Sequence, residues 1–399
     1  QVRPRGTERH CCPCLFASST DHMVEAVAAD LPIVDFSPFR EEDGVVTGDE
    51  PTLAQREVAT QINSACRAHG FIYLTNFGVS QALCDRAFAA SEQLFALPAE
   101  HKLNALQRIR PETNTGYAPF ASESLNRRRA CDLKEGFNVR SRQVYGDSHL
   151  RNTPPLFGGV CDELWAALSD AARRYCLACA LALGLQRDFF LRALDAWDLC
   201  TLRFLHYPPV TSGSAVSALG GPGSLDAPVR VGEHTDFGMF TFLLLGGGGH
   251  RGLQIKPVEG GEVDTHSHSV TEGWLDVRVP PPTAGGGAVV NTGALLARWT
   301  NDAWRATAHR VLVPCPEVAA QHRYSIACFV CPDAAAEVQV HPSFVSSEKQ
   351  CKYPKTTGKD YLLMKLREKT LESPGQQPAR KKQKTTTAAP ITAPAAQSS

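Results

Sequence analysis

Apolar residues upstream of about residue 200 recur at three- or four-residue steps, which is the spacing of one face of an amphipathic helix. Gly70 and Pro98 stand at the ends of two such stretches, where helices commonly end. The pattern predicts a mostly helical first half, with short strands at 31–36 and 71–74. The helices are expected over 52–69, over 81–97 with Ser80 as the cap, over about twenty residues after Cys161, and over 186–194.

Beyond Cys200 the pattern changes to that of strands. Short apolar runs alternate with Gly and Pro clusters, which is typical of an antiparallel sandwich or barrel. This part of the sequence has no helical pattern long enough to connect parallel strands. The predicted fold class is therefore mixed α and β, with a mainly β core. Strands are expected at 200–206, 241–245, 252–255, 274–277, 288–291, 310–313 and 324–330, and a last helix from Lys359 to Leu371.

Composition divides the chain into five parts. The first has no sustained periodicity, and the last is rich in Pro, Ala, Thr and Gln, a composition that does not support a packed core. We predict a disordered arm (1–30), a mostly helical N-terminal region (31–195), a β core (196–335), a C-terminal extension with a helix (336–371) and a disordered tail (372–399).

The bulk numbers exclude several classes of protein. Hydrophobic residues make up 43% and charged residues 21% of the 399 residues, the balance of a globular protein. The 41 basic and 41 acidic side chains cancel, so no overall field attracts nucleic acid or an anionic membrane. No apolar run approaches the ~20 residues of a membrane span. We expect a monomer with no nucleic-acid or membrane partner.

The 14 cysteines are scattered, and many lie inside apolar runs. Cys176 and Cys179, like Cys328 and Cys331, are separated by two residues, but no redox-type context surrounds either pair. Buried packing as small apolar side chains is the interpretation, and it fits a reducing compartment. We therefore predict a cytoplasmic protein, and the basic run at 380–384 leaves a nuclear address open.

The candidate chemistry begins at His234-Thr235-Asp236. Residues two apart on a strand share a side, so an imidazole and a carboxylate are expected to face one point. A third ligand has to come from farther along the chain, and His309 is the best candidate. Two histidines and one carboxylate are the ligand set of non-haem Fe(II) oxygenases. His266 and His268 have the same spacing, but they lie in a polar insert and are interpreted as a surface loop.

A second group of residues suits an anionic ligand. Arg323 and Ser325 are expected on one side of a strand, where a guanidinium and a hydroxyl could bind a distal carboxylate. Tyr207 ends an earlier strand and could add its hydroxyl to the same pocket. A zinc hydrolase could use the same metal ligands, but it would not explain Arg323 and Ser325.

With these positions in order, the sequence resembles the Fe(II)/2-oxoglutarate-dependent dioxygenases of the isopenicillin N synthase-like group. The likeness covers about 31–370 and includes His69-Gly-Phe-Ile-Tyr-Leu-Thr-Asn-Phe-Gly-Val79 and the segment 291–301. It implies a double-stranded β-helix, or jelly roll, with helices at both ends of the chain. It also implies that Fe(II) is bound by His234, Asp236 and His309, with 2-oxoglutarate at Arg323, Ser325 and Tyr207 and O2 as oxidant.

The sequence departs from the resemblance at several points. The spacing from Asp236 to His309 is long, and the insert at 257–271 accounts for the excess. Residues 314–321 lengthen the next interval in the same way, and loops tolerate added length cheaply. Leu205 stands where many plant members have Asn, and Ala294 stands where an Asp is usual. Neither change removes a metal ligand.

Three functions remain open from the sequence. The first couples oxidative decarboxylation of 2-oxoglutarate to hydroxylation, or a related oxidation, of a small organic molecule. The second is a 2-oxoglutarate-independent Fe(II) oxidase of the isopenicillin N synthase type. The third is a jelly roll that binds a ligand without turnover. Phe237, Phe240 and Trp299 are candidates for the wall of a substrate pocket.

Overall fold

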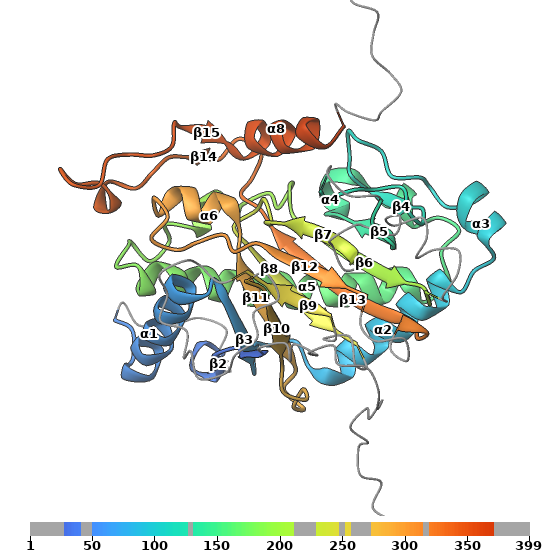
Figure 1. Cartoon of the computed structure of the whole chain (residues 1–399), viewed down its shortest axis with the longest axis horizontal. Coiled ribbons are helices and arrows are strands. Elements are labelled where there is room, and N and C mark those ends of the chain that lie inside the picture. Colours follow the sequence, from blue (N-terminus) through green and yellow to red (C-terminus); the bar gives the residue numbers. More distant parts are fainter. Residues whose placement is uncertain are drawn as a thin grey trace, which may run out of the picture.

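Two β-sheets packed face to face form the centre of the molecule in the computed structural model, and helices cover the outer face of the larger sheet (Figure 1). The structure describes residues 28–40, 50–126, 131–210, 229–246, 252–256, 273–313 and 319–370. Paired strands in these ranges run antiparallel, apart from the two parallel pairs β1–β10 and β2–β3. This is the predicted jelly-roll arrangement.

The smaller sheet has the order β1-β10-β9-β12-β7. Its strands are β1 (Ala28–Asp30), β10 (Leu275–Arg278), β9 (Leu253–Ile255), β12 (His309–Leu312) and β7 (Val229–His234). The larger sheet has the order β2-β3-β11-β8-β13-β6-β5-β4. Its strands are β2 (Ile33–Asp35), β3 (Phe71–Thr75), β11 (Gly287–Thr292), β8 (Phe240–Leu245), β13 (Arg323–Val330), β6 (Thr201–Tyr207), β5 (Glu135–Val139) and β4 (Gly116–Ala118).

The first two helices begin where the sequence predicts. Thr52 forms a capping box with Gln55, because each side chain accepts a hydrogen bond from the other residue's backbone N–H. Ser80 caps the second helix by accepting a hydrogen bond from the backbone of Leu83. The helices are α1 (Leu53–Ala68), α2 (Gln81–Phe95), α3 (Ala99–Asn104), α4 (Arg142–Tyr145), α5 (Phe157–Ala182), α6 (Ala294–Trp299) and α8 (Gly358–Thr370).

Alternation along the strands separates two hydrophobic cores. On β8, Phe242 and Leu244 face the helices, while Leu243 and Leu245 face the smaller sheet. The first core lies between the larger sheet and the helices α1, α2 and α5. The second core is smaller and lies between the two sheets, where side chains from both sheets meet.

Four expectations about secondary structure need correction. The helix predicted over 186–194 is a series of turns with one 3-10 turn at Leu191–Ala193. Residues 28–30, placed in the disordered arm, form β1 and pair with the edge of β10. Strands β4 and β5 were not predicted. The strand expected to carry both His234 and Asp236 ends at His234. The rest of the arm, both histidines of the polar insert, residues 380–384 and the tail lie outside the described residues.

Glu135 lies on β5 of the larger sheet, in a buried network of charged side chains. Its carboxylate accepts hydrogen bonds from the Lys102 ammonium at 3.0 Å and from the Tyr117 hydroxyl, and one of its oxygens lies 2.8 Å from Nδ1 of His206. Burial acts to raise the pKa of Glu135, but the hydrogen bonds from His206, Tyr117 and Lys102 bring it below its ordinary value. Polar side chains can therefore occupy a strand in which every residue is buried.

A second network of ion pairs is formed around Glu123. Its carboxylate pairs with the Arg203 guanidinium and with the Lys134 ammonium, and Lys134 also pairs with Asp132. Burial works to raise the pKa of Glu123, yet the two cations hold it far below the usual range. Because Asp132 also accepts a hydrogen bond from the backbone of Gly232, this network is tied to β7.

The cysteine pairs behave as predicted. Cys176 and Cys179 are buried in α5. Cys328 is buried on β13, and Cys331 is buried directly after that strand. Burial raises the pKa of each of these thiols, which keeps them protonated. They are apolar packing elements of the folded chain.

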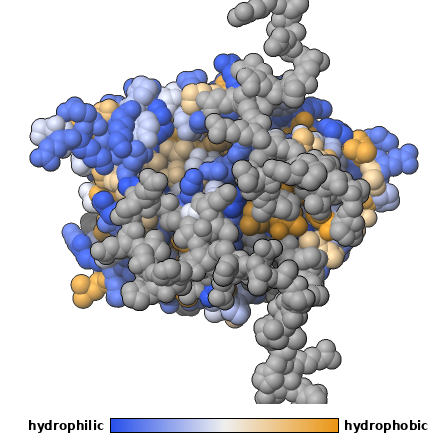
Figure 2. Space-filling view, in the orientation of Figure 1, coloured by the Kyte–Doolittle hydropathy of each residue, from blue (hydrophilic) through white to orange (hydrophobic). Residues whose placement is uncertain are grey.

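The C-terminal segment lies along one edge of the molecule. Strands β14 (Glu337–Val338) and β15 (Thr356–Thr357) pair with each other and lead into α8, drawn in red in Figure 1. Figure 2 shows that hydrophilic side chains dominate this part of the visible face. Among the described residues, no helix combines the length and the apolar character needed to cross a membrane.

Candidate metal centre and cosubstrate pocket

His234 and His309 face each other across two paired strands. His234 is the last residue of β7, His309 is the first of β12, and they are direct partners in the antiparallel register. Such cross-strand neighbours have side chains in contact. The two imidazole ring centroids are accordingly 4.2 Å apart, although 75 positions separate the residues in sequence. The rings of Phe71 and His309 pack edge to face, with their centroids 5.5 Å apart.

The two histidines use the same ring nitrogen for their hydrogen bonds to the backbone. Nδ1 of His234 lies 2.9 Å from the carbonyl oxygen of Gly232, and Nδ1 of His309 lies 3.2 Å from that of Thr307. A carbonyl oxygen only accepts, so each Nδ1 carries the proton that it donates. Each Nε2 then keeps its lone pair, which is the form of histidine that binds a metal.

Asp236 reaches the same point from a turn. After β7 ends, its backbone carbonyl accepts a hydrogen bond from the N–H of Ala294 at 2.8 Å. Gly238 lets this turn pack closely against β13, because a Cβ there would lie 2.5 Å from the carbonyl oxygen of Val330. The Oδ1 atom of Asp236 is 3.8 Å from Nε2 of His234 and 3.8 Å from Nε2 of His309.

The other carboxylate oxygen of Asp236 is fixed by two donors. Oδ2 accepts hydrogen bonds from the Thr241 hydroxyl at 2.6 Å and from the Asn291 amide at 2.8 Å. Burial acts to raise the pKa of Asp236, but His309, His234 and these two donors hold it below its ordinary value. The carboxylate is thus charged and oriented, with Oδ1 directed toward the two imidazoles.

Three ligand atoms therefore converge, one from each of His234, Asp236 and His309, and all lie within 4.8 Å of one another. Within the described part of the chain this is the one group of its kind. A single ion among them would have nitrogen, nitrogen and oxygen ligands on one side, the set that suits non-haem Fe(II). The orientation of all three ligands by other groups satisfies the further requirement of a metal site.

Arg323, Ser325 and Tyr207 also come together. Arg323 and Ser325 lie at the start of β13 on the barrel side, and both are buried. Tyr207 ends β6 directly opposite Arg323, and its ring centroid lies 4.5 Å from the Arg323 guanidinium carbon. Among the described residues, the hydroxyl of Ser325 has no hydrogen-bond partner. A buried donor without a partner suggests that a ligand completes the pocket.

The two departures noted in the sequence have clear surroundings. Leu205 is the register partner of Ser325 and belongs to the core between the sheets, so it gives the pocket an apolar wall. Ala294 begins α6, and its backbone N–H holds the turn of Asp236. Of the candidate wall residues, Phe240 and Trp299 are buried in the core under the helices, and Phe237 packs against that core.

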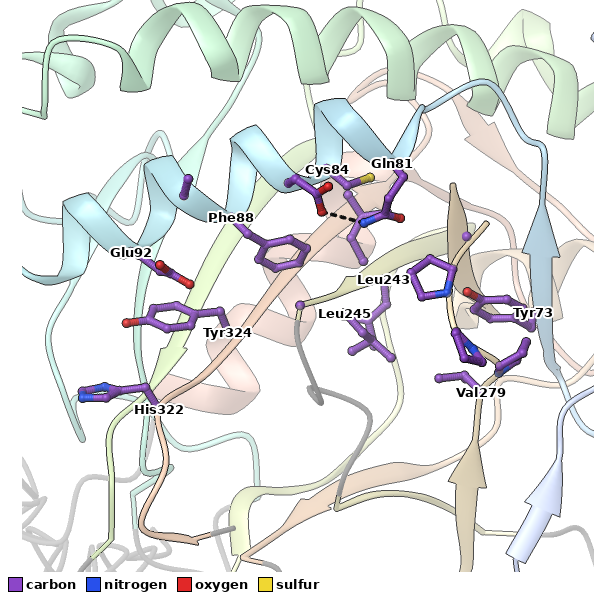
Figure 3. A pocket seen from close by; sticks show the side chains of 18 residues that line it. Tyr73, Gln81, Cys84, Phe88, Glu92, Leu243, Leu245, Val279, His322 and Tyr324 are labelled. Atoms are coloured by element: carbon purple, nitrogen blue, oxygen red, sulfur yellow. Dashed lines mark hydrogen bonds between the residues drawn. The ribbon is translucent and has the colours of Figure 1, made fainter. Parts of the chain in front are cut away.

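A cavity of about 1100 Å³ lies between α2 and the ends of β8, β11 and β13 (Figure 3). Tyr324 lines it and alternates along β13 with Arg323 and Ser325, so this part of its wall is on the opposite face of the sheet. Figure 3 shows Phe88 projecting into the space from α2. None of the six predicted site residues is part of its lining. Its lining does include Leu245, which is the register partner of Ser325, so the cavity borders the strand that carries the predicted pocket.

Family models match two parts of the chain. Residues 31–155 match the N-terminal domain of non-haem dioxygenases in morphine synthesis, and residues 199–332 match the 2OG-Fe(II) oxygenase superfamily. A 2-oxoglutarate-Fe(II) type oxidoreductase of Metarhizium majus, ppzC, is 30% identical over 313 residues, covering 72% of this chain and 74% of the relative. The chain belongs to the 2OG-Fe(II) oxygenase superfamily. The relative hxnY of Emericella nidulans, of the same described type, is 28% identical over 346 residues, covering 83% of the chain and 88% of the relative.

Solved structures agree with this family. Neurospora crassa T7H in complex with alpha-KG has a TM-score of 0.66 and 29% identity, covering 84% of this oxygenase and 95% of T7H. A 2OG-Fe(II) oxygenase family protein from Caulobacter crescentus also has a TM-score of 0.66, with 26% identity and coverage of 86% and 100%. The protein is therefore an Fe(II)- and 2-oxoglutarate-dependent oxidoreductase that uses O2, as the sequence predicts.

Sequence reasoning missed the residues that orient Asp236, one of the candidate ligands of this oxygenase. Thr241 and Asn291 are direct register partners on β8 and β11, and both donate to Asp236. Thr241 interrupts an apolar run, Asn291 directly follows one, and both are buried. A buried polar side chain requires a partner, so a polar residue at such a position is the signal that could have identified them.

Proposed function

We propose that His234, Asp236 and His309 bind Fe(II) in this oxygenase, and that Arg323 and Ser325, with Tyr207, bind the distal carboxylate of 2-oxoglutarate. The observation that supports the metal assignment best is the convergence of three ligand atoms within 4.8 Å, with the remaining polar atoms of all three side chains already hydrogen-bonded. The pair of a buried guanidinium and a buried hydroxyl supports the carboxylate assignment.

Fe(II) with 2-oxoglutarate and O2 supplies an oxidant that converts a substrate C–H bond to C–OH, while 2-oxoglutarate is decarboxylated to succinate. The residues of the chain have more limited tasks. Asp236 contributes one negative charge, and its two donors keep its free oxygen oriented. Arg323 offers its buried guanidinium to a carboxylate, and a charged hydrogen bond is strong away from water. Leu205 and the core between the sheets keep that pocket apolar.

The substrate is proposed to be a small organic molecule. Neurospora crassa T7H, which is 27% identical and has a TM-score of 0.66, has been solved with thymine. The helices that cover the barrel are packed against its larger sheet by a continuous core. We further propose that the protein acts as a monomer in the cytoplasm. The ten cysteines of the described residues are all free, and eight of them are buried, which fits a reducing compartment.

Anaerobic reconstitution with Fe(II) and 2-oxoglutarate tests the metal and cosubstrate assignment together. We expect a visible charge-transfer band when the keto acid chelates the bound iron, and no band in His309→Ala. His101→Ala is the matched control, because His101 is half-buried and its ring bonds only to the carbonyl oxygen of Asn152 among the described residues. A full band in His309→Ala would overturn the assignment. Oxygen uptake that proceeds equally without 2-oxoglutarate would favour the isopenicillin N synthase type of reaction.

A further inference from the structure

Arg230 is a buried arginine with an incomplete set of partners. It lies on β7 four residues before His234, so the two side chains leave the same face of the strand. Its exposed fraction is 0%. Nη2 donates to the carbonyl oxygens of Ala319 and Gln321 at 3.2 and 3.4 Å. Among the described residues, neither Nε nor Nη1 has a hydrogen-bond partner.

Arg140 shows how a buried arginine is satisfied when its role is structural. All three of its nitrogens donate to backbone carbonyl oxygens, Nε to Cys200, Nη1 to Thr113 and Nη2 to Asp198. Unsatisfied buried donors are costly, by about 1–3 kcal/mol each and more for charged groups. Arg230 has two such nitrogens within the described chain, which indicates that its partner is a molecule that binds.

The position of Arg230 indicates which molecule. Its guanidinium carbon lies 6.0 Å from the ring centroid of Tyr207, the same ring that Arg323 contacts at 4.5 Å. Burial and then the nearby Arg323 lower the pKa of Arg230 to about 10, while Tyr207 acts to raise it. No carboxylate of the described residues pairs with Arg230. A buried cation without a counter-ion is costly, and an anionic ligand bound beside the Tyr207 ring would supply one to Arg230.

We propose that Arg230 is a second cosubstrate-binding arginine, which donates from Nε or Nη1 to the distal carboxylate of 2-oxoglutarate beside Arg323. The inference rests on the proposed cosubstrate pocket and adds a residue to it. Its consequence is selectivity: two cations favour a keto acid that carries a second carboxylate over one of the same length that does not.

The test compares two ligands in the wild-type protein and in the variants Arg230→Met and Arg140→Met. Affinities of the Mn(II)-loaded protein for 2-oxoglutarate and for 2-oxopentanoate, which lacks the distal carboxylate, are measured by anaerobic calorimetry. Wild type should prefer 2-oxoglutarate by roughly 100-fold or more, as expected for a buried charged pair. Arg230→Met should lower the affinity for 2-oxoglutarate by about 10- to 100-fold and change the affinity for 2-oxopentanoate by less than about threefold. Arg140→Met is the control and should leave the ratio of the two affinities unchanged.

The outcomes separate this inference from the proposal beneath it. If wild type discriminates but Arg230→Met keeps the full ratio, or loses both ligands equally, the role of Arg230 is structural and the inference is wrong. If wild type itself does not discriminate, the assignment of Arg323 and Ser325 fails, and the inference fails with it. Should Arg230→Met not fold, Arg230→Lys carries the test. A lysine cannot reach both loop carbonyls and the ligand, so its ratio should also fall, and an unchanged ratio would overturn the inference.

Discussion

The donors behind Asp236 provide the sharpest test of how the metal centre is built. Asn291→Ala removes the donor at 2.8 Å from Oδ2 and leaves the Thr241 hydroxyl at 2.6 Å. A hydrogen bond to a charged group contributes about 1.5–3 kcal/mol, and each 1.4 kcal/mol is a factor of ten in affinity. Because one donor remains, the lower half of that range applies. We expect metal affinity to fall by roughly 10- to 30-fold, within the range measured for groups that orient metal ligands.

Calorimetric titration with Mn(II), which avoids oxidation of the ion, measures this change directly. Asn138→Ala is the matched control. Asn138 is also a buried amide on a strand of the larger sheet, and it donates to Asn114 away from the metal centre. Both variants should lose stability, but only Asn291→Ala should lose metal affinity. If Asn291→Ala binds Mn(II) within about threefold of wild type, the orientation of Asp236 does not control affinity and the reasoning from the hydrogen bonds is refuted.

Three further predictions concern stability. Gly70 has a φ of +68°, and a Cβ there would lie 2.6 Å from the carbonyl oxygen of Arg305, whereas Gly184 has a φ of +66° and open space; thermal melting should therefore show a larger loss for Gly70→Ala than for Gly184→Ala, and equal losses would contradict the predicted clash. Glu135→Gln leaves a buried ammonium without its counter-ion, so urea unfolding should report a cost of about 3–5 kcal/mol, far more than Asp188→Asn in an exposed pair. Because the pKa of Glu123 is lowered in the folded state, its contribution is complete above its unfolded pKa of about 4.3 and is lost as pH falls toward the folded value. Glu123→Gln should make the unfolding free energy less dependent on pH below about pH 5, and an unchanged acid dependence would show that the ion pairs do not stabilise the fold.

Apolar periodicity was a good guide wherever one face of an element is buried. It located α1, α2 and the strands of the barrel within a few residues, because their buried positions follow the period of the element. It failed for β5, in which Glu135 and Asn138 are buried as completely as their apolar neighbours. The partners of Glu135 are distant in sequence, so a local pattern contains no sign that a charged residue there can be buried.

The helix wrongly predicted over 186–194 has the opposite explanation. Its apolar residues are buried or partly buried, but tertiary contacts rather than helical neighbours bury them. Phe189 packs edge-on against His341 at 5.1 Å, and Phe190 packs in the same way against Trp299 at 5.6 Å. Helical spacing of apolar residues is a weak indicator over fewer than about ten residues, because packing can override it.

The three proposed metal ligands were selected from the sequence, and the structure brings them together, although one part of the reason was wrong. Strand alternation does not bring Asp236 to His234, because β7 has ended before Asp236 is reached. The carboxylate arrives through a turn whose backbone is held by Ala294 and whose orientation is set by Thr241 and Asn291. Thr241 and Asn291 are register partners on β8 and β11, and Ala294 begins α6, so these groups meet only once the strands have paired. Local residue types therefore point to the candidate ligands. Their geometry depends on the register of the sheets, as does the placement of Arg230 beside Tyr207, and the spacing of residues along the chain does not reveal that register.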